Sequence, residues 1–467
     1  MSMSRENMPL LAMAALFLSA PVTTAFAGAA PLTLNAGAPS QVVDLSASSD
    51  VAGSDPSLAS LVAPGDFDPS FGAGGIALFQ VSGATLIPDS VLVQPDDRIV
   101  VTGNVRTSTS CGVFASRYNA DGTIDTTFAG GLVTTMLSSG ACNAPPARAA
   151  LQPDGKIVIA ATRDPGGATD FALLRYTASG ALDTTFGAGG LVIYNYVMYD
   201  QSRDVVIQPD GRILLSGTSS NNTNNDFVVA RFTSTGALDG TFGAGGRSVY
   251  GFASGSNDSV TDMALQPDGK VLVVGLTYST GTLPDFGLVR FTASGALDST
   301  FGGGGALKIN VFGSTDQPQA VAVQTDGKIL VGGNAYYPAG SQYYMTLFRL
   351  NANGTAFDTT FNGTGQVFIS FGPVYNMISQ LAIQADGKIV ADGYTSLTAR
   401  ANNYDAALLR FLPTGGLDSS FLGGGAFTFE GFTNSDDRGA GIGFQSDGKI
   451  IEGGYSGGYI RLSRHGN

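Results

Sequence analysis

The stretch that decides the fold is Leu265–Val273, with the sequence L-Q-P-D-G-K-V-L-V. In its centre Pro presets the first φ of a tight turn, Asp accepts local amide hydrogens and Gly takes the left-handed conformation. Apolar runs on both sides of such a turn predict a β-hairpin. The motif occurs seven times, and its first turn aspartates, spaced 58, 56, 58, 58, 60 and 61 residues apart, are Asp96, Asp154, Asp210, Asp268, Asp326, Asp386 and Asp447.

Two further features recur with the same period. A motif of the form L-D-x-x-F-G-x-G-G contains the aspartates Asp68, Asp125, Asp183, Asp239, Asp298, Asp358 and Asp418. An arginine followed by Tyr, Phe or Leu stands at Arg117, Arg175, Arg231, Arg290, Arg349, Arg410 and Arg461, and we expect these side chains to anchor connectors or neighbouring repeats. Each period divides into four short strands. Four-stranded units repeated seven times predict an all-β fold, a seven-bladed β-propeller of four-stranded antiparallel blades.

The ends of the repeat array favour a closed ring over an open solenoid. The chain stops after the seventh arginine motif, and the missing connector segment stands at the other end, from Gly65 to Gly75. An open solenoid would need polar capping repeats, and the sequence has none. We therefore expect residues 63–467 to form the propeller, with the N-terminal connector closing the seam beside the last blade.

The repeat resembles the delta-60 repeat family, bacterial β-propeller-like repeats found in exported proteins. The resemblance lies in Q-P-D-G-K-I, then R-Y or R-F, then A-L-D-T-T-F-G-x-G-G, and it covers about residues 64–467. It implies a propeller fold and no established catalytic residues. Departures from the motif at Asp97, Arg98, Thr325, Ala385 and Ser446 are expected to affect only local turn stability.

Composition and the first residues place the protein outside the cytoplasm. Among 467 residues there are 65 glycines and only 13% charged residues, and 37 acids against 24 bases give a net charge of −13. This balance argues against nucleic acid or an anionic membrane as partner.

The first residues predict a signal peptide over 1–27, cleaved near Ala27. The pattern consists of Arg5, the apolar run from Leu10 to Ala20 and Ala25-Phe26-Ala27. Residues 28–62 are expected to be a flexible linker, and the mature protein to be secreted or periplasmic without membrane insertion.

The two cysteines, Cys111 and Cys142, fall in loops that should emerge on the same face of neighbouring blades. An exported protein with two such cysteines is expected to pair them, so we predict a disulfide between them.

Candidate chemistry is sparse. The single histidine, His465, is expected to be an exposed tail residue, and no catalytic residues are assigned. Asp200, Asp258, Asp316 and Asp437 each lie ten residues before a turn aspartate, where they would either close turns or bind Ca²⁺, the one cofactor that the sequence leaves open. Cations after the D-G turns would pair with turn carboxylates or form an anion-binding rim.

The variable loops carry the strongest indication of a ligand surface. Tyr336, Tyr343, Tyr337 and Tyr344 either bind a glycan or a protein or simply pack at strand ends. The leading hypothesis is a non-catalytic exported propeller that binds or scaffolds at the bacterial cell exterior. The alternatives are a calcium-dependent, lactonase-like propeller hydrolase and a structural or adhesive surface protein.

Overall fold

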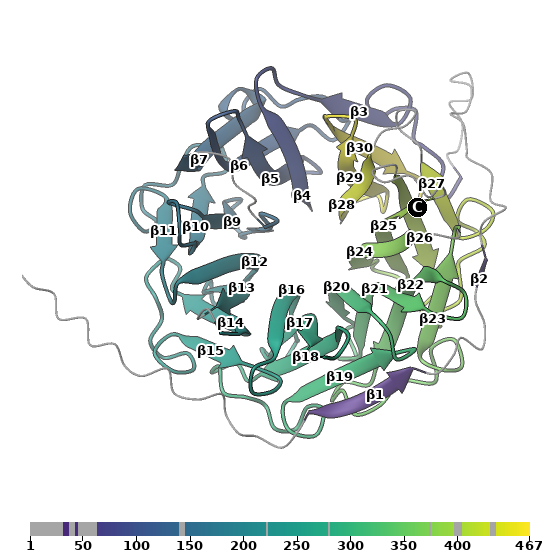
Figure 1. Cartoon of the computed structure of the whole chain (residues 1–467). Helices are drawn as coiled ribbons and strands as arrows, with labels where there is room; N and C mark the ends of the chain where they lie inside the picture. Colours follow the sequence, from purple (N-terminus) through teal and green to yellow (C-terminus); the bar gives the residue numbers. More distant parts are fainter. Residues whose placement is uncertain are drawn as a thin grey trace, which may run out of the picture.

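The computed structural model describes residues 31–36, 43–44, 63–139, 145–220, 223–278, 281–372, 375–396, 404–429 and 436–467. In these ranges the chain consists of β-strands and one short 3-10 helix, η1 (Ala129–Gly131), so the all-β prediction is confirmed. Figure 1 shows the sheets placed radially around a central axis, with the first strand of each repeat innermost. No helix among the described residues is long and apolar enough to cross a membrane.

The strands form antiparallel groups of four. Those that are continuous in sequence are β4–β7 (Thr85–Val93, Ile99–Arg106, Ser110–Tyr118, Leu132–Ser139), β8–β11 (Ala149–Leu151, Ile157–Arg163, Asp170–Tyr176, Leu191–Tyr194), β12–β15 (Tyr199–Ile207, Ile213–Ser220, Asn225–Phe232, Arg247–Tyr250), β16–β19 (Asn257–Leu265, Val271–Tyr278, Asp285–Phe291, Ala306–Val311), β20–β23 (Asp316–Val323, Ile329–Tyr337, Gln342–Leu350, Gln366–Ser370) and β24–β27 (Tyr375–Ile383, Ile389–Ser396, Asp405–Phe411, Ala426–Phe429). A single parallel bridge, Asn225 to Asn257, links two of them.

A further group combines both ends of the chain. It contains β28 (Asp437–Phe444), β29 (Ile450–Ser456) and β30 (Tyr459–His465), and its outermost strand is β3 (Ile76–Phe79). β3 pairs with β30 in antiparallel register from Ile76 opposite Ser463 to Phe79 opposite Ile460. β3, which follows the connector segment, therefore lies against the last strand of the chain.

The D-G turns have the predicted backbone. Their glycines have φ values between 81° and 85° at Gly155, Gly211, Gly269, Gly327, Gly387 and Gly448. In the first repeat Asp97 replaces the glycine and still adopts a φ of 63°. Its carboxylate accepts hydrogen bonds from the backbone N–H and the hydroxyl of Ser446, both at 2.6 Å. Two departures from the motif thus link the first and last repeats, and the expectation that they matter only locally is wrong.

The apolar core lies between neighbouring sheets. In one cluster Val158 and Ala160 of β9 pack with Leu215 of β13 and Val228 of β14. Residues on both faces of the second and third strands are buried, because each face meets either the next sheet or the previous one. This stacking holds the loop ends of adjacent repeats close together, and it positions the surfaces described below.

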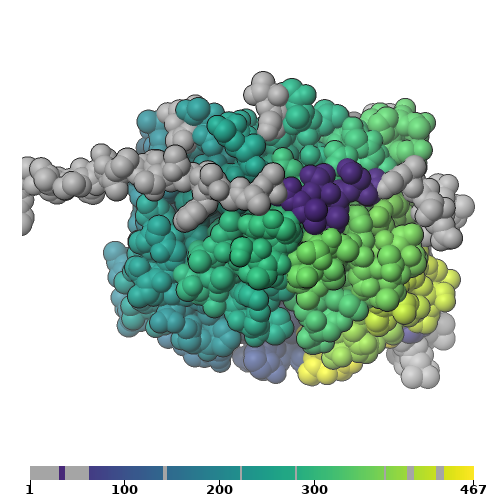
Figure 2. Space-filling view, turned by 90° about the horizontal axis from the view of Figure 1, so that it is seen from below, coloured from purple at the N-terminus to yellow at the C-terminus, as the bar shows by residue number. Residues whose placement is uncertain are grey.

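The predicted flexible linker contains two short strands. β1 (Leu32–Ala36) pairs in parallel with β19, from Leu32 opposite Leu307 to Ala36 opposite Val311, and β2 (Val43–Asp44) pairs in parallel with β23. Figure 2 shows β1 lying on the outer wall of the molecule. Leu32, Leu34 and Ala36 alternate inward and join a core cluster. This amphipathic five-residue pattern is too short to stand out in an Ala-, Ser- and Gly-rich stretch.

Candidate functional site

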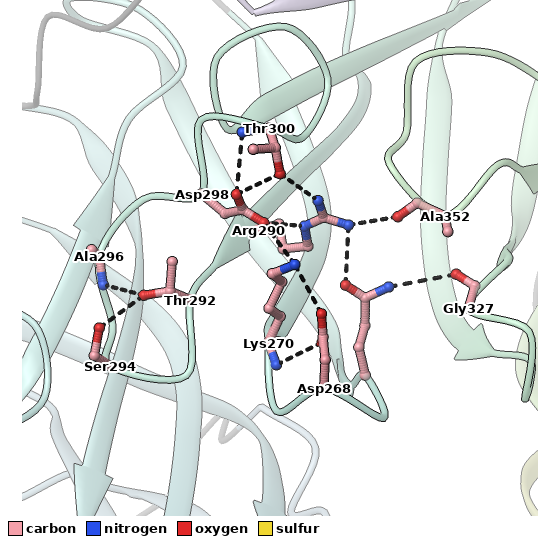
Figure 3. Close-up of polar contacts among 11 residues, drawn as sticks. Asp268, Lys270, Arg290, Thr292, Ser294, Ala296, Asp298, Thr300, Gly327 and Ala352 are labelled. Atoms are coloured by element: carbon pink, nitrogen blue, oxygen red, sulfur yellow. Dashed lines mark hydrogen bonds and ion pairs between the residues drawn. The ribbon is translucent and has the colours of Figure 1, made fainter.

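A polar cluster recurs at the D-G turn end of each repeat, and Figure 3 shows the one around Arg290. Arg290 Nε lies 2.8 Å from Asp298 Oδ2, and its Nη1 donates to the carbonyl of Ala352 in the next repeat at 2.5 Å. Asp298 in turn accepts from the hydroxyl of Thr300 and lies 3.6 Å from Lys270 Nζ. Burial alone would raise the pKa of Asp298, but these partners lower it below its ordinary value.

Corresponding contacts are made by Arg117, Arg175, Arg231, Arg349 and Arg410, which confirms their expected anchoring role. The seventh assignment is wrong. Arg464, rather than Arg461, lies 3.0 Å from Asp68 and donates to the carbonyl of Ala120. The loop between β29 and β30 contains only two residues and is shorter than its counterparts, so Arg464 takes the anchor position opposite Ile451. Arg461 instead forms a buried pair with Glu452 at 2.5 Å.

The cations after the D-G turns bridge two carboxylates each. Lys156 lies 2.8 Å from turn residue Asp154 and 3.6 Å from connector residue Asp183. The same double contact is made by Arg98, Arg212, Lys270, Lys328, Lys388 and Lys449. Because each cation is already paired, this ring supports the structural interpretation over an anion-binding rim. A shallow groove of about 620 Å³ between two of these clusters is lined by Lys270, Arg290 and Asn353 among others.

His465 is not an exposed tail residue. It is fully buried in β30, its Nδ1 lies 2.9 Å from the carbonyl oxygen of Gly65, and its Nε2 lies 2.9 Å from the Ser463 hydroxyl. Burial lowers the pKa of His465 to about 4, so the ring is neutral at physiological pH. Its partners come from the two ends of the chain, and with no solvent access it holds those ends together rather than performing catalysis.

The four aspartates assigned to calcium come from four different four-stranded groups. Asp200, Asp258, Asp316 and Asp437 stand at the beginning of β12, β16, β20 and β28, and all four are fully buried. Three of them accept backbone N–H groups from the loop just before the strand, as Asp200 does from Tyr196 at 2.7 Å and Asp316 from Val311 at 2.6 Å. These bonds support turn closure, the alternative function of these residues. Within the described residues no three His, Cys, Asp or Glu side chains are grouped to hold a metal.

A charged cluster on the innermost strands was missed by sequence reasoning. The side chains of Asp204 and Asp262 contact each other, and Arg148 Nη1 is 3.7 Å from Asp262. Burial raises the pKa of both carboxyls, that of Asp204 well above its usual range. Each carboxylate also accepts a backbone N–H from the next inner strand, Asp204 from Met263 and Asp262 from Val321. Their sequence signal, an aspartate four residues before the motif glutamine, is confined to two repeats.

Arg148 and these backbone bonds make the carboxylate pair a poor fit for calcium. Ca²⁺ takes six to eight oxygen ligands. Here a guanidinium already lies beside one carboxylate, and an oxygen of each is used by the backbone. The cluster therefore fits an inter-strand ionic tie better than a metal centre.

The predicted tyrosine set divides into two halves. Tyr336 lies opposite Tyr343 in the β21–β22 hairpin, and their ring centroids are 5.0 Å apart. Tyr337 and Tyr344 point to the other side of the hairpin, where both pack against Phe312, and Tyr344 is only 5% exposed. Successive strand residues face opposite sides, so adjacent tyrosines had to separate. Tyr336 and Tyr343 can therefore contact a ligand, whereas Tyr337 and Tyr344 pack at the strand ends.

Tyr336 and Tyr343 begin a larger surface, the aromatic belt, which comprises Tyr336, Tyr343, Tyr375, Tyr394 and Tyr404. Centroid distances along it are 5.0 Å from Tyr343 to Tyr375, 5.9 Å from Tyr375 to Tyr394 and 5.0 Å from Tyr394 to Tyr404. All five rings are half-buried and lie at the strand ends opposite the D-G turns.

Polar groups border the aromatic belt. The guanidinium of Arg438 covers Tyr404 at 4.6 Å and Tyr394 at 5.2 Å, and it pairs with Asp436 at 2.8 Å. On the other side the Tyr375 hydroxyl donates to Gln317 at 3.0 Å. Tyr375, Tyr404 and Arg438 belong to no repeat motif, so single-sequence reasoning had no signal to join them to the predicted tyrosines.

Comparison with known proteins agrees with this geometry. The model of a domain of unknown function (DUF5122), described as a β-propeller, matches residues 94–128, 152–186, 208–242, 266–301, 324–361 and 384–421. Each match runs from the motif glutamine to the phenylalanine beneath the anchoring arginine. The chain is a β-propeller-like repeat protein. This confirms the repeat class, and the delta-60 name stays a prediction. The propeller unit of Arg464 and Asp68 draws its residues from both chain ends, where a linear match cannot extend.

Solved structures with a similar fold have diverse functions. A catalytically inactive virginiamycin B lyase from Staphylococcus aureus with quinupristin shares 12% identity over 83% of this chain and 98% of that one, with a TM-score of 0.42. The polysaccharide lyase Uly1 shares 11% identity over 84% of this chain and 92% of that one, with a TM-score of 0.46. Chaetomium thermophilum Sqt1 bound to the N-terminus of a ribosomal protein shares 13% identity over 81% of this chain and 84% of that one, with a TM-score of 0.40. Likeness at this level transfers no activity. A search of curated proteins found no match.

The predicted disulfide falls partly outside the described residues. Cys111 is buried near the start of β6, whereas Cys142 is not among the residues that the structure describes. The pairing stays a prediction.

Proposed function

We propose that this protein is a non-catalytic, exported binding module built as a closed ring of seven blades. The seven equivalent arginine clusters, including the one formed by Arg464 and Asp68, support the blade count. Pairing of β3 with β30 and the bond between Asp97 and Ser446 support closure at the seam. The signal-peptide pattern over residues 1–27 supports export.

The aromatic belt is the observation that carries the binding function. Large rings that are half-buried and unrelated to the repeat have no evident role in forming the blades, whereas the repeated residues account for blade packing and connection. Tyrosine supplies an apolar face together with a hydroxyl, a combination enriched at recognition surfaces. Five such rings converge from two neighbouring blades, β20–β23 and β24–β27, so the stacking of these blades joins them into one surface.

The alternative of a calcium-dependent propeller hydrolase has less support. It would need converging carboxylates with free oxygens, and Asp204 and Asp262 are instead tied to backbone N–H groups and lie beside Arg148. A structural or adhesive surface protein remains compatible with the same belt, since adhesion is itself binding.

Saturation transfer NMR against a mixed panel of soluble glycans and peptides tests the binding function. At least one panel member should bind wild-type protein and lose binding when Tyr336 and Tyr394 are both replaced by Ala. A matched Tyr278→Ala variant, changed at an exposed tyrosine of another blade, should bind normally. Absence of any binding, or equal binding by the double variant, would overturn the proposal.

A further inference from the structure

We infer that the aromatic belt binds a neutral polysaccharide, an inference that rests on the proposed binding function and specifies its ligand. The first argument is the shape of the surface. From Tyr336 to Tyr404 the centroid of each ring lies 5.0 to 5.9 Å from that of the next, so the five rings form one continuous aromatic row. A chain of sugar rings presents successive apolar C–H faces that can stack along such a row.

The second argument is the polar border. Sugar hydroxyl groups require donors and acceptors beside the stacking surface, preferably planar groups that bind two hydroxyls at once. Gln317 lies at one edge of the belt, bonded to Tyr375, and the Asp436–Arg438 pair lies at the other edge. The border thus offers amide, carboxylate and guanidinium groups within one surface.

Asn334 extends the polar border beneath the belt. It lies directly opposite Gln317 in the β20–β21 register and is fully buried. Its side-chain amide interacts with the Tyr375 side chain, which also donates to Gln317. These two amide side chains therefore fix the Tyr375 hydroxyl at the edge of the belt.

Charge argues for a neutral polymer over an anionic one. Arg438 is the cation that contacts the belt, and Asp436 neutralises it at 2.8 Å. The whole chain carries a net charge of −13. A polyanion approaching this surface would therefore meet no compensating positive field.

The composition of the belt argues for a glycan over a protein. Protein recognition relies on buried anchor side chains that fill pockets, surrounded by an apolar contact area. The most exposed aliphatic residues of the described chain, Met198 and Leu283, lie at the same strand ends as the belt but in the β12–β15 and β16–β19 groups, whereas Leu238 and Leu412 lie near the D-G turn ends. The rings of the belt also fill the space between one another, which leaves no slot for a proline or leucine anchor.

Native gel electrophoresis with polymer cast into the gel tests the inference. The neutral probes are dextran, galactomannan and xylan, the anionic probe is alginate, and a proline-rich peptide is tested by fluorescence anisotropy. Wild-type protein should be retarded by at least one neutral polymer. Tyr336→Ala and Tyr394→Ala should each weaken that binding roughly tenfold, as the loss of one stacking contact and its buried area implies. Tyr278→Ala and the ring-preserving Tyr394→Phe should keep most of it.

The outcomes separate this inference from the proposed function. If the peptide or alginate binds through the belt tyrosines and no neutral polymer does, the glycan inference is wrong and the binding function stands. If no probe binds, both fail. Equal retardation of wild type and both alanine variants places the ligand elsewhere and overturns the belt as its site. Melting temperatures of all variants, measured first, ensure that lost binding does not reflect lost folding.

Discussion

Replacing Arg290 by Met should destabilise the propeller far more than removing any exposed charge. The side chain of Arg290 is only 4% exposed, and it contacts Asp298, Thr300 and the carbonyl of Ala352. It also covers the ring of Phe301 at 4.7 Å. Met preserves much of the apolar stem and its packing, so the substitution removes mainly the charge and the hydrogen bonds (Figure 3).

The magnitude follows from the groups left behind. Removing one partner of a buried ion pair typically costs about 3–5 kcal/mol, because the other charge stays buried without compensation. Asp298 keeps its bond to Thr300 and its contact with Lys270, which places the ionic part near the lower limit. The carbonyl of Ala352 loses a charged donor, which adds about 1 kcal/mol or more. We expect a total loss of about 4 kcal/mol in the free energy of unfolding.

Urea titration followed by far-UV circular dichroism and by tyrosine fluorescence measures this loss. Lys270→Met is the matched control, since its ammonium group contacts the same Asp298 but is 31% exposed, and it should cost about 1 kcal/mol or less. Arg290→Lys, which keeps the charge without the planar fork, should fall between the two. A loss below about 1 kcal/mol for Arg290→Met, or one equal to that of Lys270→Met, would refute the assignment of Arg290 as the anchor between repeats.

Four other outcomes are expected. The connector aspartates Asp68, Asp183 and Asp358 have pKa values of about 2 in the folded protein, so they bind fewer protons in the folded state than in the unfolded state. The melting temperature should therefore fall as pH drops from about 4 to 2. Burial raises the pKa of Asp316 to about 9, so the folded protein holds this proton more tightly than the unfolded chain, and the contribution of Asp316 to the free energy of unfolding should decline as pH rises from about 4 to 9. Ala335→Ser places a hydroxyl opposite Asp316, like that of Ser219 beside Asp200, and should reduce this decline. Thiol labelling of oxidatively purified protein should find no free cysteine, and Cys142→Ser should cost about 3–4 kcal/mol, whereas two reactive thiols would exclude the disulfide. Deleting residues 28–80 should lower the melting temperature well beyond deletion of 28–44, and equal values would contradict closure by β3.

The sequence was sufficient for the repeat because the repeat is local. Each D-G turn is specified by consecutive residues, and the glycine φ values near 83° follow from that chemistry alone. The pairing of these anchoring arginines with the aspartate eight or nine residues later was likewise within reach, since both residues belong to one repeated segment. Periodicity therefore predicts the strands, the turns and six of the anchors.

Prediction failed where a contact joins residues that the period does not relate. Arg464 replaced Arg461 as the seventh anchor because a shorter loop changed the spacing on which the assignment relied. The burial of His465 was not predicted, because its partner Gly65 lies 400 residues away in sequence. The aromatic belt was not predicted for the same reason, since Tyr343 and Tyr375 meet only after neighbouring blades stack.

Departures from the repeat therefore carry more information about this molecule than the repeat itself. Asp97 occupies the turn position where the other repeats have glycine. Its carboxylate accepts a hydrogen bond from Ser446, a second departure from the motif, and this bond joins the first and last repeats. A left-handed aspartate is strained relative to glycine, so it is stable only where its side chain makes a contact that glycine lacks. The same logic applies to the belt, whose tyrosines lie outside the repeat motif and contact one another across two neighbouring blades, and it is the reason why we propose a ligand for them.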